Sequence, residues 1–279
     1  MKTRIFSAVV ALALFAAVIT LKDTVPFLLY IVISFICADT VWELIYNTKM
    51  VKSKAITVIC MIYGAFTPFV YAGIISFLTV THLNLLLAVV LLVVALARHI
   101  KITPIEVACG FSFTVFVTYA FSTLMMLIRK PDGYGIVYLL IACAFAWGCD
   151  TGAYFTGVFF GKHKLAPVIS PKKTVEGAVG GIIICVIITV VLGFIFNNTL
   201  IGANETINLV KLGIITPVFA VLGMIGDLLA SYIKRSVGIK DYGKIMPGHG
   251  GVLDRFDSLL LIAPVFYLTL EILPIIERI

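Results

Sequence analysis

Residues 175–196 read VEGAVGGIIICVIITVVLGFIF and are the clearest structural signal in the sequence. The stretch carries one charged residue, Glu176, near its start. An apolar run of about 20 residues spans a bilayer as an α-helix, because a helix satisfies its own backbone hydrogen bonds where water is absent. Residues 175–196 therefore predict a membrane-spanning helix.

The rest of the chain repeats this pattern. Of its 279 residues, 61% are hydrophobic and 13% are charged, and the mean hydropathy is +1.14, which argues against a water-soluble globule. We therefore predict an all-α, polytopic membrane protein with about nine transmembrane helices. The other eight runs, bounded by charged residues, Pro or Asn, are 5–21, 25–45, 55–79, 83–97, 105–128, 135–160, 214–233 and 258–276.

Two of these assignments have alternatives. The first run follows Lys2 and Arg4, as the apolar core of a signal peptide would. We interpret it as a membrane helix, because no small-residue cleavage site separates it convincingly from the next run. Residues 55–97 admit other divisions, because Pro68 lies inside the predicted third span.

The distribution of positive charge predicts the orientation. Nine spans would place the N-terminus on one side of the membrane with four loops, and these segments hold 16 of the 21 Lys and Arg residues. An excess of Lys and Arg marks the cytoplasmic face, so we expect the N-terminus inside and the C-terminus outside, in the plasma or inner membrane. The net charge of +7 is then explained without a nucleic-acid partner. The loops are 46–54, 98–104, 161–174 and 234–257.

We expect two sets of helices. Residues 1–130 would form about five N-terminal spans, and residues 131–279 would form about four catalytic spans with the cytoplasmic loops 161–174 and 234–257. The six cysteines lie inside apolar runs without CxxC spacing, so they predict packing residues, not disulfides or a zinc site.

Acidic residues within apolar runs are candidates for function, because ionised groups are costly in lipid. Asp39 and Glu43 lie four residues apart near the cytoplasmic end of the second run. Their position favours an interfacial pair that contacts loop lysines or lipid headgroups, with a functional role as the alternative. Glu106 follows Pro104 and is interpreted as a first-turn acid that complements the helix dipole.

Asp150 and Asp227 differ from these, because each lies deeper in an apolar run and beside glycine. Glycine permits close backbone approach or a bend. Ser231, Lys234 and Arg235 follow Asp227 within two helical turns. We predict that both aspartates belong to a site; a structural hydrogen bond for Asp150 and a simple ion pair for Asp227 are the alternatives.

Residues 231–257 are the densest cluster of chemically capable side chains. Their glycines would let backbone N–H groups approach an anion, and His249 lies among these glycines. Their cations could bind phosphate oxygens. The residues concerned are Lys234, Arg235, Lys240, Lys244, Gly248, Gly250, Gly251 and Arg255.

Asp254 and Asp257 lie three residues apart at the predicted start of the last span, so both carboxylates should face the same way. With Asp227 from the preceding helix they would offer hard oxygen ligands, which suit Mg²⁺. This combination favours metal-assisted phosphoryl or nucleotidyl transfer.

The loop before the seventh span contributes more cations. Its sequence Ser170-Pro-Lys-Lys-Thr174 ends an expected extended loop where residues 175–196 begin. Lys172 and Lys173, with free N–H groups at the helix start, could bind an anion. The excess of Lys and Arg in cytoplasmic loops is enough to explain basic residues here. It does not explain why the two lysines lie between Ser-Pro and Thr.

Together these motifs resemble the signature of the phosphatidate cytidylyltransferase (CDP-diacylglycerol synthase) family. The resemblance covers roughly the C-terminal half of the chain. The N-terminal spans match the family only in hydropathy. The matching segments are Asp150-Thr-Gly-Ala-Tyr, Ser170-Pro-Lys-Lys-Thr-Val-Glu-Gly177, Ser231-Tyr-Ile-Lys-Arg, Lys240-Asp-Tyr-Gly and Pro247-Gly-His-Gly-Gly-Val-Leu-Asp-Arg-Phe-Asp257.

The resemblance implies Mg²⁺-dependent transfer from CTP to phosphatidate, giving CDP-diacylglycerol and pyrophosphate, by a homodimer in the membrane. A second cation could accompany Mg²⁺. The implied metal ligands are Asp227 and Asp254, and Asp150, His249 and Asp257 are further catalytic candidates. The implied substrate-binding residues are Ser170, Lys172, Lys173, Thr174, Ser231, Lys234, Arg235, Lys240, Asp241, Gly250, Gly251 and Arg255.

Two other classes remain open at this point. One is a related lipid enzyme, either another CDP-lipid synthase or a CTP-dependent lipid-alcohol kinase that would release CDP. The other is a secondary transporter that uses Asp150 and Asp227 for ion coupling. A transporter predicts inverted repeats with interrupted helices in matching positions, and the sequence has no evident repeat.

Overall fold

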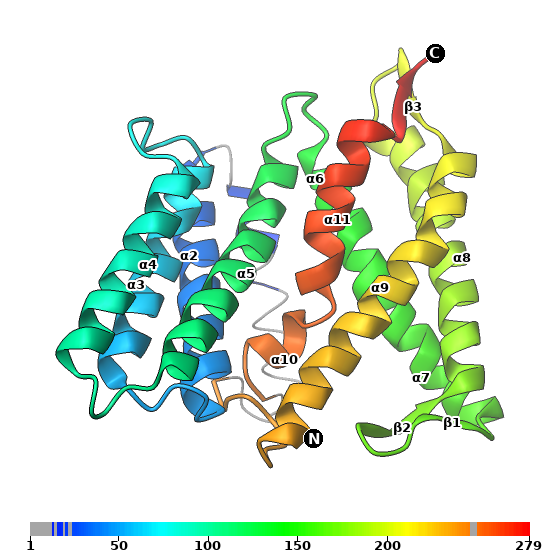
Figure 1. Cartoon of the computed structure of the whole chain (residues 1–279). Coiled ribbons are helices and arrows are strands. Elements are labelled where there is room, and N and C mark those ends of the chain that lie inside the picture. The colour runs from blue at the N-terminus through cyan, green and yellow to red at the C-terminus, as the bar shows by residue number, and fades with distance from the viewer. Residues whose placement is uncertain (1–12, 14–15, 19, 22–23, 246–249) are drawn as a thin grey trace. The chain divides into compact units, whose positions relative to one another are not determined.

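The computed structural model describes residues 13, 16–18, 20–21, 24–245 and 250–279. These residues are predominantly helical (Figure 1). They divide into two compact units. The first comprises the described residues up to Met126 and those of Ser236–Phe256, and the second comprises Leu127–Arg235 and Asp257–Ile279.

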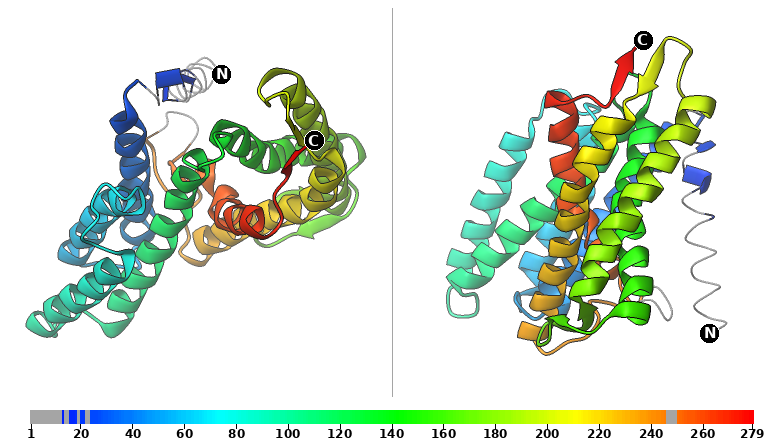
Figure 2. Two further views of the ribbon diagram at one scale, coloured as in Figure 1. Left: turned by 90° about the horizontal axis from the view of Figure 1, so that it is seen from above. Right: turned by 90° about the vertical axis from the view of Figure 1, so that its right-hand side faces the viewer.

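The first unit is built from apolar helices. α2 packs along α3, and α3 packs along α4 (Figures 1 and 2). α3 approaches α5 at Gly110, where an added Cβ would lie 3.0 Å from Ile56 Cγ2. The bounds are α2 Pro26–Trp42, the π-helical η1 Glu43–Asn47, α3 Lys54–Tyr71, α4 Val80–Ala97, α5 Pro104–Ile128 and α10 Leu253–Phe256.

The second unit combines helices with two short antiparallel ribbons. α6, η2 and α7 follow one another without a break as one long helix, and α7 packs against α8. One ribbon pairs β1 with β2, and the other pairs β3 with β4 at the C-terminus (Figure 2). The bounds are α6 Gly135–Cys143, η2 Ala144–Gly148, α7 Cys149–Phe160, β1 Lys164–Ala166, β2 Ser170–Thr174, α8 Val175–Thr199, β3 Glu205–Ile207, α9 Leu209–Ser236, α11 Leu259–Ile272 and β4 Ile276–Arg278.

An aromatic cluster forms the core of the second unit. Phe145 of η2 stacks on Phe219 of α9 with 4.8 Å between ring centroids. Phe266 of α11 meets both rings edge-on, at 5.2 and 5.3 Å. Such contacts add to the stabilisation from burial and fix these three elements together.

Glycine allows α7 and α8 to approach closely. A Cβ added at Gly181 would lie 2.8 Å from Ala153 Cβ and 2.9 Å from the carbonyl oxygen of Cys149. Small residues at such crossings are typical of membrane helices, whose association depends on close packing.

We expect Gly181→Ala to reduce the stability of the protein in detergent, by about 1–3 kcal/mol, because overpacking forces the helices apart. Gly213→Ala is the matched control, since its Cβ would make an ordinary 3.7 Å contact with Val190. Thermal unfolding followed by circular dichroism measures both. Equal midpoints for the two variants would contradict the proposed close packing at Gly181.

The predicted all-α membrane class is confirmed. Seven helices of the described chain are long and apolar enough to cross a membrane. Many of their large apolar side chains are exposed, as on α4 and α8, which is expected of surfaces solvated by lipid. The seven are 27–47, 54–71, 80–97, 104–128, 135–160, 175–199 and 209–236.

The first and ninth predicted spans lie at the two ends of the chain. The first predicted span, 5–21, lies largely outside the described residues. The ninth, 258–276, was predicted too long: α11 covers only Leu259–Ile272. Pro274 disfavours helix at the residue before it, and Ile276–Arg278 pairs with β3 instead. Pro68, by contrast, lies inside α3 without ending it.

The six cysteines have free thiols, and all but the partly exposed Cys109 are buried, as predicted for packing residues.

Candidate active site

The second unit brings four of the predicted site residues together. Lys173 of β2 forms an ion pair with Asp227 of α9. Ser231, one turn further along α9, donates a hydrogen bond from Oγ to Asp227 Oδ1 at 3.4 Å. Asp257 lies within electrostatic reach of Asp227. We call Lys173, Asp227, Ser231 and Asp257, with Asp150 and Lys234, the acid–lysine cluster.

Asp150 and Lys234 are included in the cluster because both interact electrostatically with Asp257. Asp150 lies in the first turn of α7, directly after the π-helical η2. Short π-helical segments frequently occur at functional sites. Ser258 donates from Oγ to Asp150 Oδ2 at 3.4 Å. Lys234 is buried. The site role predicted for Asp150 thus remains a prediction with structural support.

Asp257 is held where its ionised form is costly. Burial raises the pKa of the Asp257 carboxyl, and the neighbouring Asp227 raises it further. The backbone of Asp257 also packs closely on α9, because an added Cβ at Gly226 would lie 2.8 Å from the Asp257 carbonyl oxygen. The carboxylates of Asp227 and Asp257 therefore gain from any cation that binds beside them.

The predicted common helix start for Asp254 and Asp257 is wrong. Asp254 lies in the four-residue helix α10, and α11 begins only at Leu259. Asp257 Oδ1 accepts the N–H of Ser258 at 2.8 Å. Such local side-chain bonds compete with helical bonding, and this one lies at the break between α10 and α11.

The loop before α8 is a ribbon and not the extended loop that was predicted. Thr174 ends β2 and caps α8, because its Oγ1 accepts the N–H of Gly177 at 3.1 Å. The helix start at Val175 is as predicted. The N–H of Gly177, however, is already paired with Thr174 and is not one of the free N–H groups that were predicted to bind an anion. Arg235 Nε donates to the Ile169 carbonyl oxygen at 3.4 Å, which ties the end of α9 to the segment that precedes Ser170.

In the first unit, backbone N–H groups hold Asp254. Its Oδ2 accepts from Tyr242 N at 2.8 Å and from Gly251 N at 3.0 Å. Gly250 has a φ of +89°, a conformation that L side chains rarely adopt. The glycines of the signature thus shape a turn around a protein carboxylate. Phosphate binding by this turn stays a prediction.

The contacts of Glu43 with this turn are a feature that the sequence did not reveal. Glu43 is fully buried, and its two oxygens accept from Val252 N at 3.1 Å and Leu253 N at 2.8 Å. The interpretation of Glu43 as an interfacial acid that contacts lysines or headgroups is therefore corrected. A buried carboxylate requires strong hydrogen bonds, and the turn supplies them. The useful signal was an acid inside an apolar run.

The remaining predicted residues fall into two groups. His249 and Gly248 lie outside the described residues. The others carry polar or charged side chains: Lys172, Arg235, Lys240, Asp241, Lys244 and Arg255 are exposed, and Ser170 is half-buried.

The residues present suit a metal ion that also binds substrate. Within the described parts of the chain, no three His, Cys, Asp or Glu side chains form a ready metal cage. Mg²⁺ does not require one, because it is usually held by one or two carboxylates together with substrate phosphates and water. The proximity of Asp227, which together with burial raises the pKa of the Asp257 carboxyl, favours a cation beside the two side chains.

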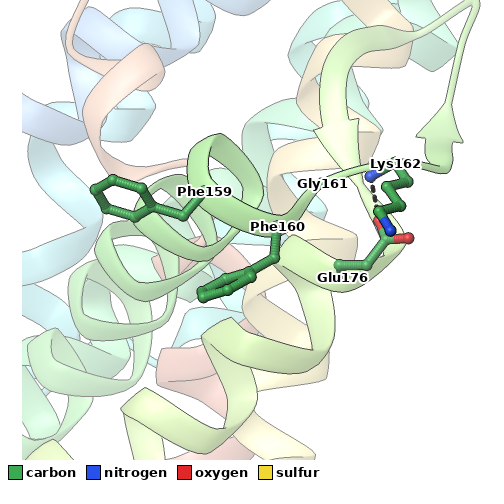
Figure 3. A pocket seen from close by; sticks show the side chains of 5 residues that line it. All are labelled: Phe159, Phe160, Gly161, Lys162 and Glu176. Atoms are coloured by element: carbon green, nitrogen blue, oxygen red, sulfur yellow. Dashed lines mark hydrogen bonds between the residues drawn. The ribbon is translucent and has the colours of Figure 1, made fainter.

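A hollow of about 520 Å³ lies elsewhere in the second unit, at the junction of α7 and α8 (Figure 3). Phe159 and Phe160 line it with Gly161, and Lys162 N donates to Glu176 Oε2 at 3.0 Å. The two rings point away from Lys162 in Figure 3. None of the predicted site residues lines this hollow, so we do not place the chemistry in it.

Fold and site define a multi-pass membrane protein with acidic and basic side chains clustered in its second unit. Comparison with known proteins gives the family. Residues 2–273 match the model of the cytidylyltransferase family. The chain therefore belongs to the cytidylyltransferase family.

Several relatives carry the name phosphatidate cytidylyltransferase. The one from Staphylococcus saprophyticus is 34% identical over 97% of this chain and 99% of its own length. The one from Bacillus subtilis is 44% identical, but that match spans 52% of this chain and about half (51%) of the relative. The Haemophilus influenzae relative is 39% identical over 56% of this chain and 54% of its own length.

Proposed function

We propose that this protein transfers a cytidylyl group from CTP to phosphatidate, forming CDP-diacylglycerol and pyrophosphate. The observation that carries the proposal is the near full-length match to a relative named phosphatidate cytidylyltransferase. The acid–lysine cluster supports it, because lysines beside carboxylates suit a reaction between two phosphate esters.

In the reaction, a phosphate oxygen of phosphatidate attacks the α-phosphorus of CTP, and the bond to the β-phosphate breaks. Both substrates are anions and repel each other, so cationic side chains must hold them in line. We assign this role to Lys172, Lys173, Lys234, Arg235, Lys240 and Arg255. The attacking phosphate is already ionised, so the protein needs no general base.

Asp227 and Asp254 would hold Mg²⁺, which when bound supplies positive charge to the triphosphate. Asp150 and Asp257 would complete the acidic surroundings. Ser170, Thr174, Ser231, Asp241, Gly250 and Gly251 would contact the substrates, and we keep His249 as a further candidate. Each assignment rests on the family resemblance.

We place the active site at the cytoplasmic face of the plasma or inner membrane, in a homodimer with about nine spans per chain. The charge asymmetry supports this orientation, because 16 of the 21 Lys and Arg residues lie in segments predicted on one side. A site at the ends of helices would receive phosphatidate from the bilayer and CTP from water.

We expect turnover of the purified protein to require CTP, phosphatidate and Mg²⁺ together. Removing Mg²⁺ with EDTA should lower pyrophosphate release to background, and adding it back should restore the rate, because the charged substrates need a counter-ion. Pyrophosphate detection in detergent micelles measures this. Undiminished turnover in EDTA would contradict the proposed metal, and no turnover under any condition would contradict the proposed reaction.

A further inference from the structure

We propose that Glu43 and Asn47, on the N-terminal helix α2–η1, are positioning residues that set the direction of the Asp254 carboxylate. This inference rests on the proposed function, in which Asp254 binds the metal. It assigns a part in the reaction to a segment of the chain that lies outside the signature motifs of the C-terminal half.

Two sets of contacts join η1 to the chain segments that meet at Asp254. Glu43 accepts hydrogen bonds from Val252 N at 3.1 Å and Leu253 N at 2.8 Å, which directly precede Asp254. Asn47 Nδ2 donates to the Tyr242 carbonyl oxygen at 2.7 Å. Tyr242 N in turn donates to Asp254 Oδ2. The helix thus holds both chain segments that meet at Asp254.

Glycine makes the first contact possible. A Cβ on Gly243 or on Gly251 would overlap with the Glu43 carboxylate. Gly251 N also donates to Asp254 Oδ2 at 3.0 Å. The absence of a side chain at Gly243 and Gly251 therefore leaves room for the Glu43 carboxylate. Gly251 also donates its N–H to Asp254. The carboxylates of Glu43 and Asp254 share a single network of backbone N–H donors.

The burial of Glu43 makes this network rigid. The side chain is completely inaccessible to solvent, so its bonds to Val252 and Leu253 are not exchanged for bonds to water. Residues that orient a metal ligand typically change metal affinity or activity about 10–100-fold when substituted. Glu43 would orient Asp254 in this way, through the backbone N–H groups of Val252 and Leu253.

The test compares Glu43→Gln with Glu106→Gln. Glu106 is a matched control, because it is also buried in the first unit and its Oε2 accepts two consecutive backbone N–H groups, from Lys52 at 3.0 Å and Ser53 at 3.2 Å. Both substitutions remove one buried carboxyl group and weaken two bonds of the same kind. Only Glu43 bonds the turn that contains Asp254.

Amide hydrogen exchange of the full chain in detergent, without substrates, gives the first measurement. We expect Glu43→Gln to accelerate exchange at residues 251–254, and Glu106→Gln to accelerate it at residues 52–53 instead. Unchanged exchange at 251–254 in Glu43→Gln would overturn the inference. This measurement does not depend on turnover, so it separates failure of the inference from failure of the proposed function.

Turnover gives the second measurement. We expect Glu43→Gln to raise the Mg²⁺ concentration needed for half-maximal rate about 10-fold, with the KM for phosphatidate unchanged and activity partly restored by excess Mg²⁺. An equal shift in Glu106→Gln would overturn the inference. Asn47→Ala should also raise the Mg²⁺ concentration needed for half-maximal rate. If Glu43→Gln does not fold, Asn47→Ala provides the test. An unchanged Mg²⁺ requirement in Asn47→Ala would contradict the proposal.

Discussion

Asp254→Asn is expected to reduce turnover at least about 100-fold while the protein remains inserted and folded. The substitution removes the negative charge that Mg²⁺ needs. It leaves a side-chain oxygen that can still accept from Tyr242 N and Gly251 N, so the turn itself should persist. The loss should therefore appear in catalysis and not in the amount of folded protein.

The control for this variant is Asp132→Asn. Asp132 also accepts a backbone N–H, from Tyr134 at 3.0 Å, and a second bond from Tyr138 Oη at 2.7 Å. It has no role in the proposed reaction, so its turnover should stay near that of the unmodified protein. Pyrophosphate release and size-exclusion chromatography are measured on both. Near-normal activity of Asp254→Asn would remove Asp254 from the proposed metal site.

Lys173→Ala is expected to have a comparably large effect, a fall in turnover of about 100-fold or more. Lys173 is paired with Asp227, and the two side chains are only 23% and 24% exposed. Its loss removes a cation for the phosphates and also leaves Asp227 beside Asp257 without its neutralising partner. Lys173→Arg should retain intermediate activity, because it keeps the charge but changes its geometry.

Lys211→Ala provides the comparison for Lys173. Lys211 also forms an ion pair, with Glu277, and these side chains are 34% and 36% exposed. Breaking that pair tests the cost of losing a lysine–carboxylate contact away from the acid–lysine cluster. Steady-state rates at saturating CTP measure both variants. If Lys173→Ala were no less active than Lys211→Ala, the proposed role of Lys173 in substrate binding would be wrong.

Hydropathy predicted the helices well where lipid is the solvent. The predicted span 135–160 coincides with α6, η2 and α7, and the predicted span 175–196 differs from α8 by three residues at one end. The sequence predicted these helices because a membrane helix pairs all its backbone N–H and C=O groups within one segment. The hydropathy of that segment alone therefore indicates the helix. The ribbons escaped prediction, because polar three- to five-residue strands such as β2 carry no clear alternation.

The site was only partly predictable for a related reason. Lys173 and Asp227 were both identified as candidates, and the structure pairs them. Because they lie on separate elements, their spacing in the sequence did not indicate that they are partners. The bond between Glu43 and Val252 joins residues 209 positions apart. A charge inside an apolar run indicates that a partner is needed, but only the fold shows which backbone groups provide it.

The fate of labelled CTP tests nucleotidyl transfer to a lipid phosphate most directly. The purified protein is incubated with phosphatidate, Mg²⁺ and CTP labelled at either the α- or the γ-phosphate. We predict that the α-label enters the lipid and that the γ-label leaves as pyrophosphate. Transfer of the γ-label to lipid with formation of CDP would contradict nucleotidyl transfer and indicate a lipid kinase.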